Sequence, residues 1–232
     1  MPVSVHIADV PITRAPALLV RRPRPAKVPG LREAGMGLAS PLGPGFFPRP
    51  SPHRVALVAF WDDDDSIDRF EAEHPVARGL SDGFSARLRP LRAYGHWPGL
   101  DDDVPAGRSV DADGPFIVLT LGRLRLSQSI RFFRTSAKAE ASLADADGLL
   151  WATGFGLPPF VATCSLWADT EAVTRYAYGV KNKAHHDAIA EGHRNAFHKQ
   201  QAFIRFEPYA VTGSLPRTNP LPAGVLDLPT AA

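Results

Sequence analysis

The chain of 232 residues has a single cysteine, no long apolar run and little net charge. One cysteine, Cys164, excludes an internal disulfide and favours a reducing compartment. No apolar run reaches the roughly 20 residues of a membrane-spanning helix, and the first residues lack the apolar core of a secretion signal. The formal charge of +2, with the cations between 21 and 27 interrupted by prolines, argues against a nucleic-acid partner. We therefore expect a cytoplasmic protein with no transmembrane segment.

What the chain does contain is ample material for a core, with 44% hydrophobic and 22% charged residues. Its length allows one large domain or two small ones that share a core. The 23 prolines concentrate in the first fifty residues, around 98–115 and after 216, where they mark long connections. We expect the segment 213–232 to be a disordered tail.

One pattern occurs twice along the chain. A strand with an aromatic end, an acidic helix start and a return strand with an Arg-x-x-Pro ending lie within 60–90 and again within 166–208. In the first copy Trp61 directly precedes the aspartates 62–65, and in the second copy Asp169 lies two positions after Trp167. The strands 54–61 and 160–167 are therefore predicted to be equivalent members of two repeats.

Hydrophobic periodicity predicts the elements of each repeat. The second half reads as strand, helix, strand, strand, helix and strand, which is the ferredoxin-like order. Its predicted elements are the strands 116–121, 148–154, 160–167 and 202–208, the helix 127–143, a helix capped by Asp169 or Thr170, and a helical segment 184–196. The first half is a fainter copy, with strands 3–8, 54–61 and 84–94 and helices 15–22 and 67–72.

Each predicted sheet carries helices on one face only, so its other face needs cover, and packing the two sheets together provides it. The predicted fold class is α+β, with tandem ferredoxin-like repeats that form a dimeric α+β barrel within one chain. The expected division is an N-terminal repeat over 1–100, a linker over 101–114, a C-terminal repeat over 115–212 and the tail over 213–232.

A histidine cluster occurs only in the second copy. His185, His186, His193 and His198 fall within fourteen residues, directly before the last strand. There is no His-Glu-x-x-His motif and no cysteine pair, so the spacing does not indicate a zinc enzyme. One interpretation is a solvated polar helix face. The other is a haem site, because haem iron needs one proximal ligand and leaves the opposite side open for oxygen chemistry.

Other residues suit a haem pocket by their chemistry. Arg131, Arg134 and Arg194 are candidates to bind haem propionates, since a guanidinium matches a carboxylate in a bidentate fork. Trp151 and Phe197 are suited to line a flat cofactor or an apolar substrate. The alternatives are surface charge for the arginines and ordinary core positions for the aromatics.

Two further features are not expected to carry chemistry. Cys164 lies in the middle of a predicted strand, where a buried inert thiol is the better interpretation than a thiolate ligand of haem. The aspartates at 62–65 coincide with a predicted helix start, where carboxylates offset the helix dipole rather than collect a metal.

In several segments the chain resembles the spheroidene monooxygenase family of haem-dependent carotenoid oxygenases. The resemblance covers most of the chain and is clearest over 116–208. The matching segments are Arg-x-x-x-x-x-Arg-Phe-Phe-Arg from Arg125, Gly-Leu-Leu-Trp-Ala-Thr-Gly-Phe-Gly from Gly148, Ser-Leu-Trp from Ser165, Tyr-Ala-Tyr from Tyr176, His-x-x-Ala-Ile from His185 and Phe-Ile-Arg-Phe from Phe203.

The resemblance implies a haem-dependent monooxygenase that acts on a small apolar substrate of carotenoid or terpenoid type. It implies haem, dioxygen and an external electron donor such as ferredoxin, and therefore a redox partner protein. On the family pattern the axial iron ligand falls on His185, with His186 as the second choice. An apolar substrate also leads us to expect contact with a membrane surface for substrate access.

Two other classes remain open on the sequence. A haem barrel of this kind is also compatible with a dehydratase or a peroxide-consuming enzyme. A duplicated α+β barrel is also compatible with a non-catalytic ligand-binding protein, because fold does not determine function. The sequence assigns no catalytic residue.

Overall fold

A computed structural model describes residues 1–42, 49–107, 110, 114–144, 146–178, 196–215, 219–222, 224 and 226, with the side chains of 138–142, 144 and 178 left out. The first half contains β1 (Val3–Asp9), α1 (Ala15–Val20), β2 (Leu31–Pro41), β3 (Arg54–Trp61), α2 (Asp64–Glu73), α3 (Pro75–Leu80) and β4 (Phe84–His96). The second half contains β5 (Phe116–Leu124), the short 3-10 helix η1 (Leu126–Gln128), α4 (Ser129–Ala144), β6 (Leu149–Leu157), β7 (Phe160–Trp167), α5 (Thr170–Tyr178) and β8 (His198–Thr212).

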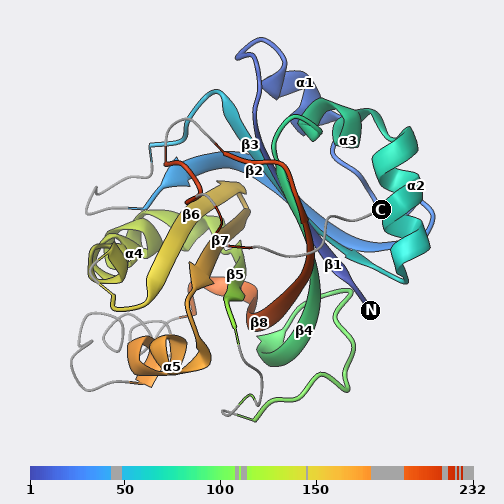
Figure 1. The fold of residues 1–232 in the computed structure, drawn as a ribbon. Helices are drawn as coiled ribbons and strands as arrows, with labels where there is room; N and C mark the ends of the chain where they lie inside the picture. Colours follow the sequence, from blue (N-terminus) through green and yellow to red (C-terminus); the bar gives the residue numbers. More distant parts are fainter. Residues whose placement is uncertain are drawn as a thin grey trace.

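The strands form a closed antiparallel barrel with the order β1-β3-β2-β6-β7-β5-β8-β4 (Figure 1). Read repeat by repeat, the first sheet runs β2-β3-β1-β4 and the second runs β6-β7-β5-β8, which is the same order. The two sheets join through β2 with β6 and through β4 with β8. β3 and β7 occupy equivalent places, so the predicted tandem ferredoxin-like repeats and the α+β barrel are confirmed.

Strand register makes the equivalence of the two repeats residue-specific. Ser4 of β1 lies opposite Arg87 of β4, and Val118 of β5 lies opposite Arg205 of β8. Ser4 and Val118 are equivalent, since each also pairs with the residue two positions before the tryptophan that ends β3 or β7. Arg87 and Arg205 therefore stand at the same position of the two repeats.

The core has an interior part and two outer parts. Alternate residues of every strand point into the barrel, as in Val3, Val5 and Ile7 of β1, and they form one continuous apolar cluster. A second cluster lies between the outer face of the first sheet and the helices α1 to α3. A third lies outside the second sheet, around Trp167 and Leu143. Each sheet thus has one face in the barrel and one face toward its helices.

β6 is longer than the sequence predicts. Phe155 and Gly156 belong to the strand rather than to a Gly/Pro turn, and they pair with β2 at Ala39 and Leu38. Glycines allow β2 and β6 to lie close together where the two sheets join, because a Cβ on Gly37 would lie 2.0 Å from the carbonyl carbon of Gly156. β8 is also longer than predicted, since its pairing with β4 and β5 extends to both ends.

Parts of the predicted tail contact the barrel. Leu215 is buried in the interior cluster. The backbone oxygen of Asn219 accepts hydrogen bonds from Trp151 Nε1 (3.0 Å) and Arg54 Nη1 (3.2 Å), and its Nδ2 donates to the oxygen of Ala152 (2.8 Å). The predicted helical segment 184–196 lies almost wholly outside the described residues. Within the described part of the chain, no helix has the length and apolarity needed to cross a membrane.

Candidate functional site

The candidate site is the outer face of the second sheet, where β5 and β8 run side by side. We call it the second-repeat site and define it by Thr120, Gly122, Phe197, His198, Phe203 and Arg205. Thr120 pairs with Phe203, and both side chains are half-buried. At the equivalent place of the first repeat, His6 pairs with Ser85, and His6 is only 4% exposed. The helices α2 and α3 cover the first face. On the second face, Thr120, His198 and Phe203 are half-buried, while Gly122, Phe197 and Arg205 are buried.

His198 lies flat against β5 because residue 122 is a glycine. A Cβ at Gly122 would be 2.6 Å from His198 Nε2, so any larger residue would displace the imidazole. His198 Nδ1 is 3.1 Å from Gln201 Oε1, and the imidazole contacts the Phe132 ring edge-on at 5.0 Å between centroids. Burial lowers the pKa of His198, which keeps the imidazole neutral at neutral pH.

α4 joins this face through Arg131. The Cζ atom of Arg131 lies 4.6 Å from the centroid of the Phe197 ring, and Nη1 donates to Gln128 Oε1 at 2.7 Å. Phe132 packs edge-on against Phe197 at 5.9 Å. The structure thus brings together two residues, Arg131 and Phe197, that the sequence selects independently. Arg134, also predicted, lies exposed on the same helix.

Trp151 lies apart from these residues. It is 5% exposed and belongs to the cluster inside the barrel, and its Nε1 donates to the backbone oxygen of Asn219. The second sheet therefore stands between Trp151 and α4. The predicted site residues His185 and Arg194, together with His186 and His193, lie outside the described residues.

Sequence reasoning overlooks Arg205, a site residue that the fold reveals. Its side chain is 4% exposed and its Nη2 lies 3.5 Å from Thr174 Oγ1 of α5. A buried guanidinium is unusual, because a buried charge is stable only when anionic or polar groups bind it. The signal that could have identified it is the repeated Arg-x-x-Pro of the return strands, which aligns Arg205 with Arg87.

The chemistry of the second-repeat site fits a flat apolar cofactor that carries carboxylates. Gly122 leaves room for the His198 imidazole against the strand, Phe197 and Phe203 are aromatic, and Arg131 and Arg205 are permanent cations. Cys164 does not compete as an iron ligand, because burial raises the pKa of its thiol to about 12. Among the described residues, no group of three or more His, Cys, Asp or Glu side chains is placed to hold a metal ion.

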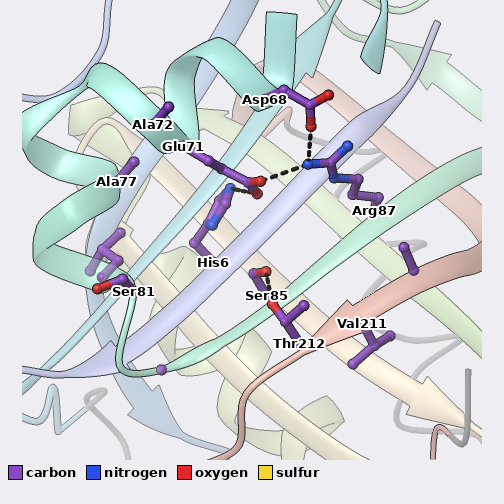
Figure 2. A pocket seen from close by; sticks show the side chains of 13 residues that line it. His6, Asp68, Glu71, Ala72, Ala77, Ser81, Ser85, Arg87, Val211 and Thr212 are labelled. Atoms are coloured by element: carbon purple, nitrogen blue, oxygen red, sulfur yellow. Dashed lines mark hydrogen bonds and ion pairs between the residues drawn. The ribbon is translucent and has the colours of Figure 1, made fainter. Parts of the chain in front are cut away.

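A second feature is a cavity of about 570 Å³ in the first repeat, between α2, α3 and the ends of β4 and β8 (Figure 2). Arg87 is the centre of its polar wall, with Nη2 2.5 Å from Asp68 Oδ1 and 2.6 Å from Glu71 Oε2. Ser85 Oγ and Thr212 Oγ1 lie 2.7 Å apart on the strand side. The carboxylates that face this cavity are thus engaged by the protein's own arginine.

His6 lies beneath this ion-pair cluster, as Figure 2 shows. Its Nε2 is 3.1 Å from Ser4 Oγ and 4.0 Å from Glu71 Oε1. Burial and, to a smaller extent, the charge of Arg87 together lower the pKa of His6 to about 4. At neutral pH the imidazole is therefore neutral, and the cluster is an internal charge network of the first repeat.

The fold defines the class of protein: a dimeric α+β barrel made by the two halves of one chain. A sequence comparison then identifies a particular relative, the spheroidene monooxygenase of Cereibacter sphaeroides, at 24% identity over 199 residues. The match covers 83% of this chain, and the chain spans 61% of the length of that curated relative. The resemblance expected from the sequence is thus confirmed. No protein-family model matches the chain.

Solved structures show more distant similarities. An aldoxime dehydratase in complex with butyraldoxime superposes with a TM-score of 0.48 and 11% identity, over 89% of this chain and 79% of that one. A putative monooxygenase from Lactobacillus acidophilus NCFM gives a TM-score of 0.39 and 12% identity, over 91% and 96% of the two chains. At these TM-scores and identities, neither similarity supports a function or a cofactor.

Proposed function

We propose that the protein is a haem-dependent monooxygenase that acts on an apolar substrate of carotenoid or terpenoid type. The observation that carries this proposal is the sequence similarity to spheroidene monooxygenase over 199 residues. The chemistry of the second-repeat site supports it, because aromatic and cationic side chains are combined there beside the His198 imidazole. The reaction requires dioxygen and an external electron donor such as ferredoxin, and a cytoplasmic location would suit both.

In this proposal His185 supplies the imidazole that binds the iron. Arg131, Arg194 and Arg205 are the residues that hold the carboxylates of the cofactor, whereas the exposed Arg134 is not assigned to it. When bound, haem supplies the redox chemistry that transfers one oxygen atom to a substrate carbon, while the other oxygen leaves as water with electrons from the donor.

The protein's own contribution is to bind and orient an apolar molecule. The half-buried Phe203 provides aromatic surface against which such a molecule packs, and the buried Phe197 lies on the same outer face. Trp151 is a further aromatic on the inner side of the same sheet. The neutral His198 imidazole adjoins these rings, with Phe132 at 5.0 Å and Phe197 at 6.4 Å between ring centroids. It is therefore able to donate or accept a hydrogen bond without placing a charge beside the substrate.

An absorption spectrum of the protein as expressed tests the cofactor. We expect a Soret band that His185→Ala abolishes, while the matched variants His193→Ala and His198→Ala retain it. Loss of the band in His186→Ala alone would move the ligand by one residue. A protein that stays colourless after incubation with haemin would overturn the proposal.

Turnover measurements test the reaction class. Product formation from an apolar polyene or terpene should require both oxygen and reductant. Undiminished turnover under anaerobic conditions without a reductant would instead indicate a haem dehydratase, and would contradict a monooxygenase.

A further inference from the structure

Two large aliphatic side chains stand exposed where η1 meets α4. Leu126 is 67% exposed and Ile130 is 60% exposed, and they are four positions apart. Single exposed apolar residues are ordinary on protein surfaces, but two neighbouring ones form a small patch that calls for an explanation. α4 lies on the outside of the barrel beside β6, so its outer side is not part of the barrel wall (Figure 1).

The same segment is strongly basic. Between residues 123 and 138 there are five cationic residues and no acidic one: Arg123, Arg125, Arg131, Arg134 and Lys138. The formal charge of the whole chain is only +2, so the rest of the chain is net acidic. Arg125 and Arg134 are exposed on either side of Leu126 and Ile130. A short basic stretch with protruding aliphatic side chains is the pattern of a segment that lies in an anionic lipid interface.

This basic aliphatic surface, defined as Arg125, Leu126, Ile130 and Arg134, adjoins the second-repeat site. The next residue along α4, Arg131, contacts the Phe197 ring at 4.6 Å and is held by Gln128. The backbone of Arg125 also donates to the oxygen of Phe197 at 2.8 Å. One end of α4 therefore connects the exposed surface with the candidate site.

We propose that the basic aliphatic surface binds the surface of an anionic lipid bilayer, with Leu126 and Ile130 inserted at the level of the acyl chains. Arginines at the flanks pair with lipid phosphates, while aliphatic tips contribute by leaving water. An acidic protein partner would match the charge of the arginines, but it would bury little apolar area against only two aliphatic side chains. A lipid surface matches both the charge and the aliphatic side chains. Its role, which is to present a membrane-dissolved substrate to the second-repeat site, rests on the proposed function, but the binding itself does not.

Vesicle co-sedimentation of the purified full chain tests this surface. We expect binding to phosphatidylcholine vesicles that contain phosphatidylglycerol, and little binding to phosphatidylcholine alone. Raising the salt from about 0.1 M to about 1 M shortens the Debye length from about 10 Å to about 3 Å and should weaken the binding. Leu126→Ser with Ile130→Ser should lower the partition coefficient by about tenfold or more. Arg125→Gln and Arg134→Gln should each lower it about fivefold.

The matched control is Ile12→Ser with Val20→Ser, which removes two exposed aliphatic side chains, at 51% and 78% exposure, from a segment of the first repeat that is also basic, with Arg14 and Arg21 exposed beside them. It therefore tests whether a basic aliphatic segment remote from the second-repeat site is sufficient for binding. This control should bind vesicles like the unchanged protein, and circular dichroism should show all variants folded. Absence of binding to anionic vesicles, or an equal loss in the control, would overturn the proposal. Binding to an acidic ferredoxin without binding to vesicles would also overturn it, and would show that this surface binds a redox protein.

Vesicle binding needs neither haem nor substrate, so the two proposals fail separately. A protein that binds anionic vesicles but takes up no haem keeps the membrane surface and loses the proposed function. A protein that has a Soret band but does not bind vesicles keeps the proposed function and loses the membrane surface.

Discussion

The two repeats place an arginine at the same register position and surround it differently. Arg87 lies in β4 and Arg205 in β8, and both side chains are at least nine-tenths buried. The helices that approach them start in the same way, because Asp63 accepts a hydrogen bond from Ser66 N at the start of α2 and Asp169 does the same for the third residue after it at the start of α5. From these caps onward, α2 and α5 can be compared residue by residue.

Five and eight positions after the cap, α2 carries Asp68 and Glu71, and both bind Arg87. The corresponding positions of α5 carry Thr174 and Ala177, and Thr174 Oγ1 lies 3.5 Å from Arg205 Nη2. In the first repeat, α2 thus supplies carboxylates to the buried cation, while the corresponding positions of α5 hold a hydroxyl and a methyl group. The two helices therefore present different side chains to equivalent arginines. Four predictions test this difference, from the largest expected effect to the smallest.

The largest difference is expected at equivalent aromatic residues of the two helices. Phe70 of α2 is 2% exposed and packs 5.0 Å from Trp61, whereas Tyr176 of α5 is half-buried at 5.2 Å from Trp167. Phe70→Ala should lower the free energy of unfolding by about 3–5 kcal/mol. Tyr176→Ala should lower it by about 1–2 kcal/mol, because less apolar surface is buried there. Urea denaturation measures both, and equal losses would show that the two faces are equally closed.

The next difference concerns pH, because His6 titrates and its counterpart Thr120 does not. The pKa of His6 is about 4 in the folded protein and about 6.5 when unfolded, so the unfolded state binds more protons between these values. Stability contributed by the neutral imidazole is present above about pH 6.5 and is lost as the pH falls toward 4, by about 3 kcal/mol. His6→Thr should flatten this part of the stability profile. A profile as steep as that of the unchanged protein would rule out His6 as its source.

A smaller effect is expected from the hydroxyl that each buried tryptophan uses. Trp61 Nε1 donates to Ser4 Oγ, and Trp167 Nε1 donates to Ser165 Oγ, both at 2.9 Å. In the first repeat the hydroxyl belongs to Ser4 of β1, which pairs with Ala59 of β3. In the second repeat the equivalent pair is Val118 with Ser165, and the hydroxyl belongs to the β7 residue. Ser4→Val should cost about 1–3 kcal/mol by leaving the indole N–H without an acceptor. Adding Ala59→Ser should recover most of it, and thermal unfolding would reveal a failure to do so.

The smallest effect is expected from the outer carboxylate of the ion-pair network. The side chain of Asp68 is 55% exposed, and Arg87 keeps Glu71 when Asp68 is removed. Asp68→Thr, which copies the second repeat, should therefore cost less than about 1 kcal/mol. High salt should reduce this cost further. A loss of several kcal/mol in urea denaturation would mean that Asp68, and not Glu71, holds the buried arginine.

Much of the fold could be predicted because its signals are local. The acidic run at 62–65 marks a helix start, and Asp63 does cap α2. The element order of the second repeat follows from periodicity, whereas β2 and α3 of the first repeat are not among the predicted elements. The longer β6 could not be predicted, because Gly156, close before two prolines, is typical of a turn but is held in the strand by Leu38 of β2.

Of the predicted site residues that the structure describes, Arg131 and Phe197 lie in contact. Their role at a cofactor stays a prediction. Trp151 was grouped with them by composition, but the alternation of β6 turns its side chain into the barrel. Arg205 was overlooked because a single arginine in a strand carries no local mark of burial.

The sequence by itself determined most elements of the second repeat and the acidic starts of α2 and α5, because periodicity and capping depend on residues a few positions apart. Only the tertiary structure decided the place of β2, which helix supplies carboxylates to its buried arginine and how the two sheets close into one barrel. Those features depend on pairings such as Leu38 with Gly156 and Arg92 with Arg205, which join strands from different halves of the chain. A contact across that separation is set by the packing of both sheets at once and leaves no periodic mark in either segment.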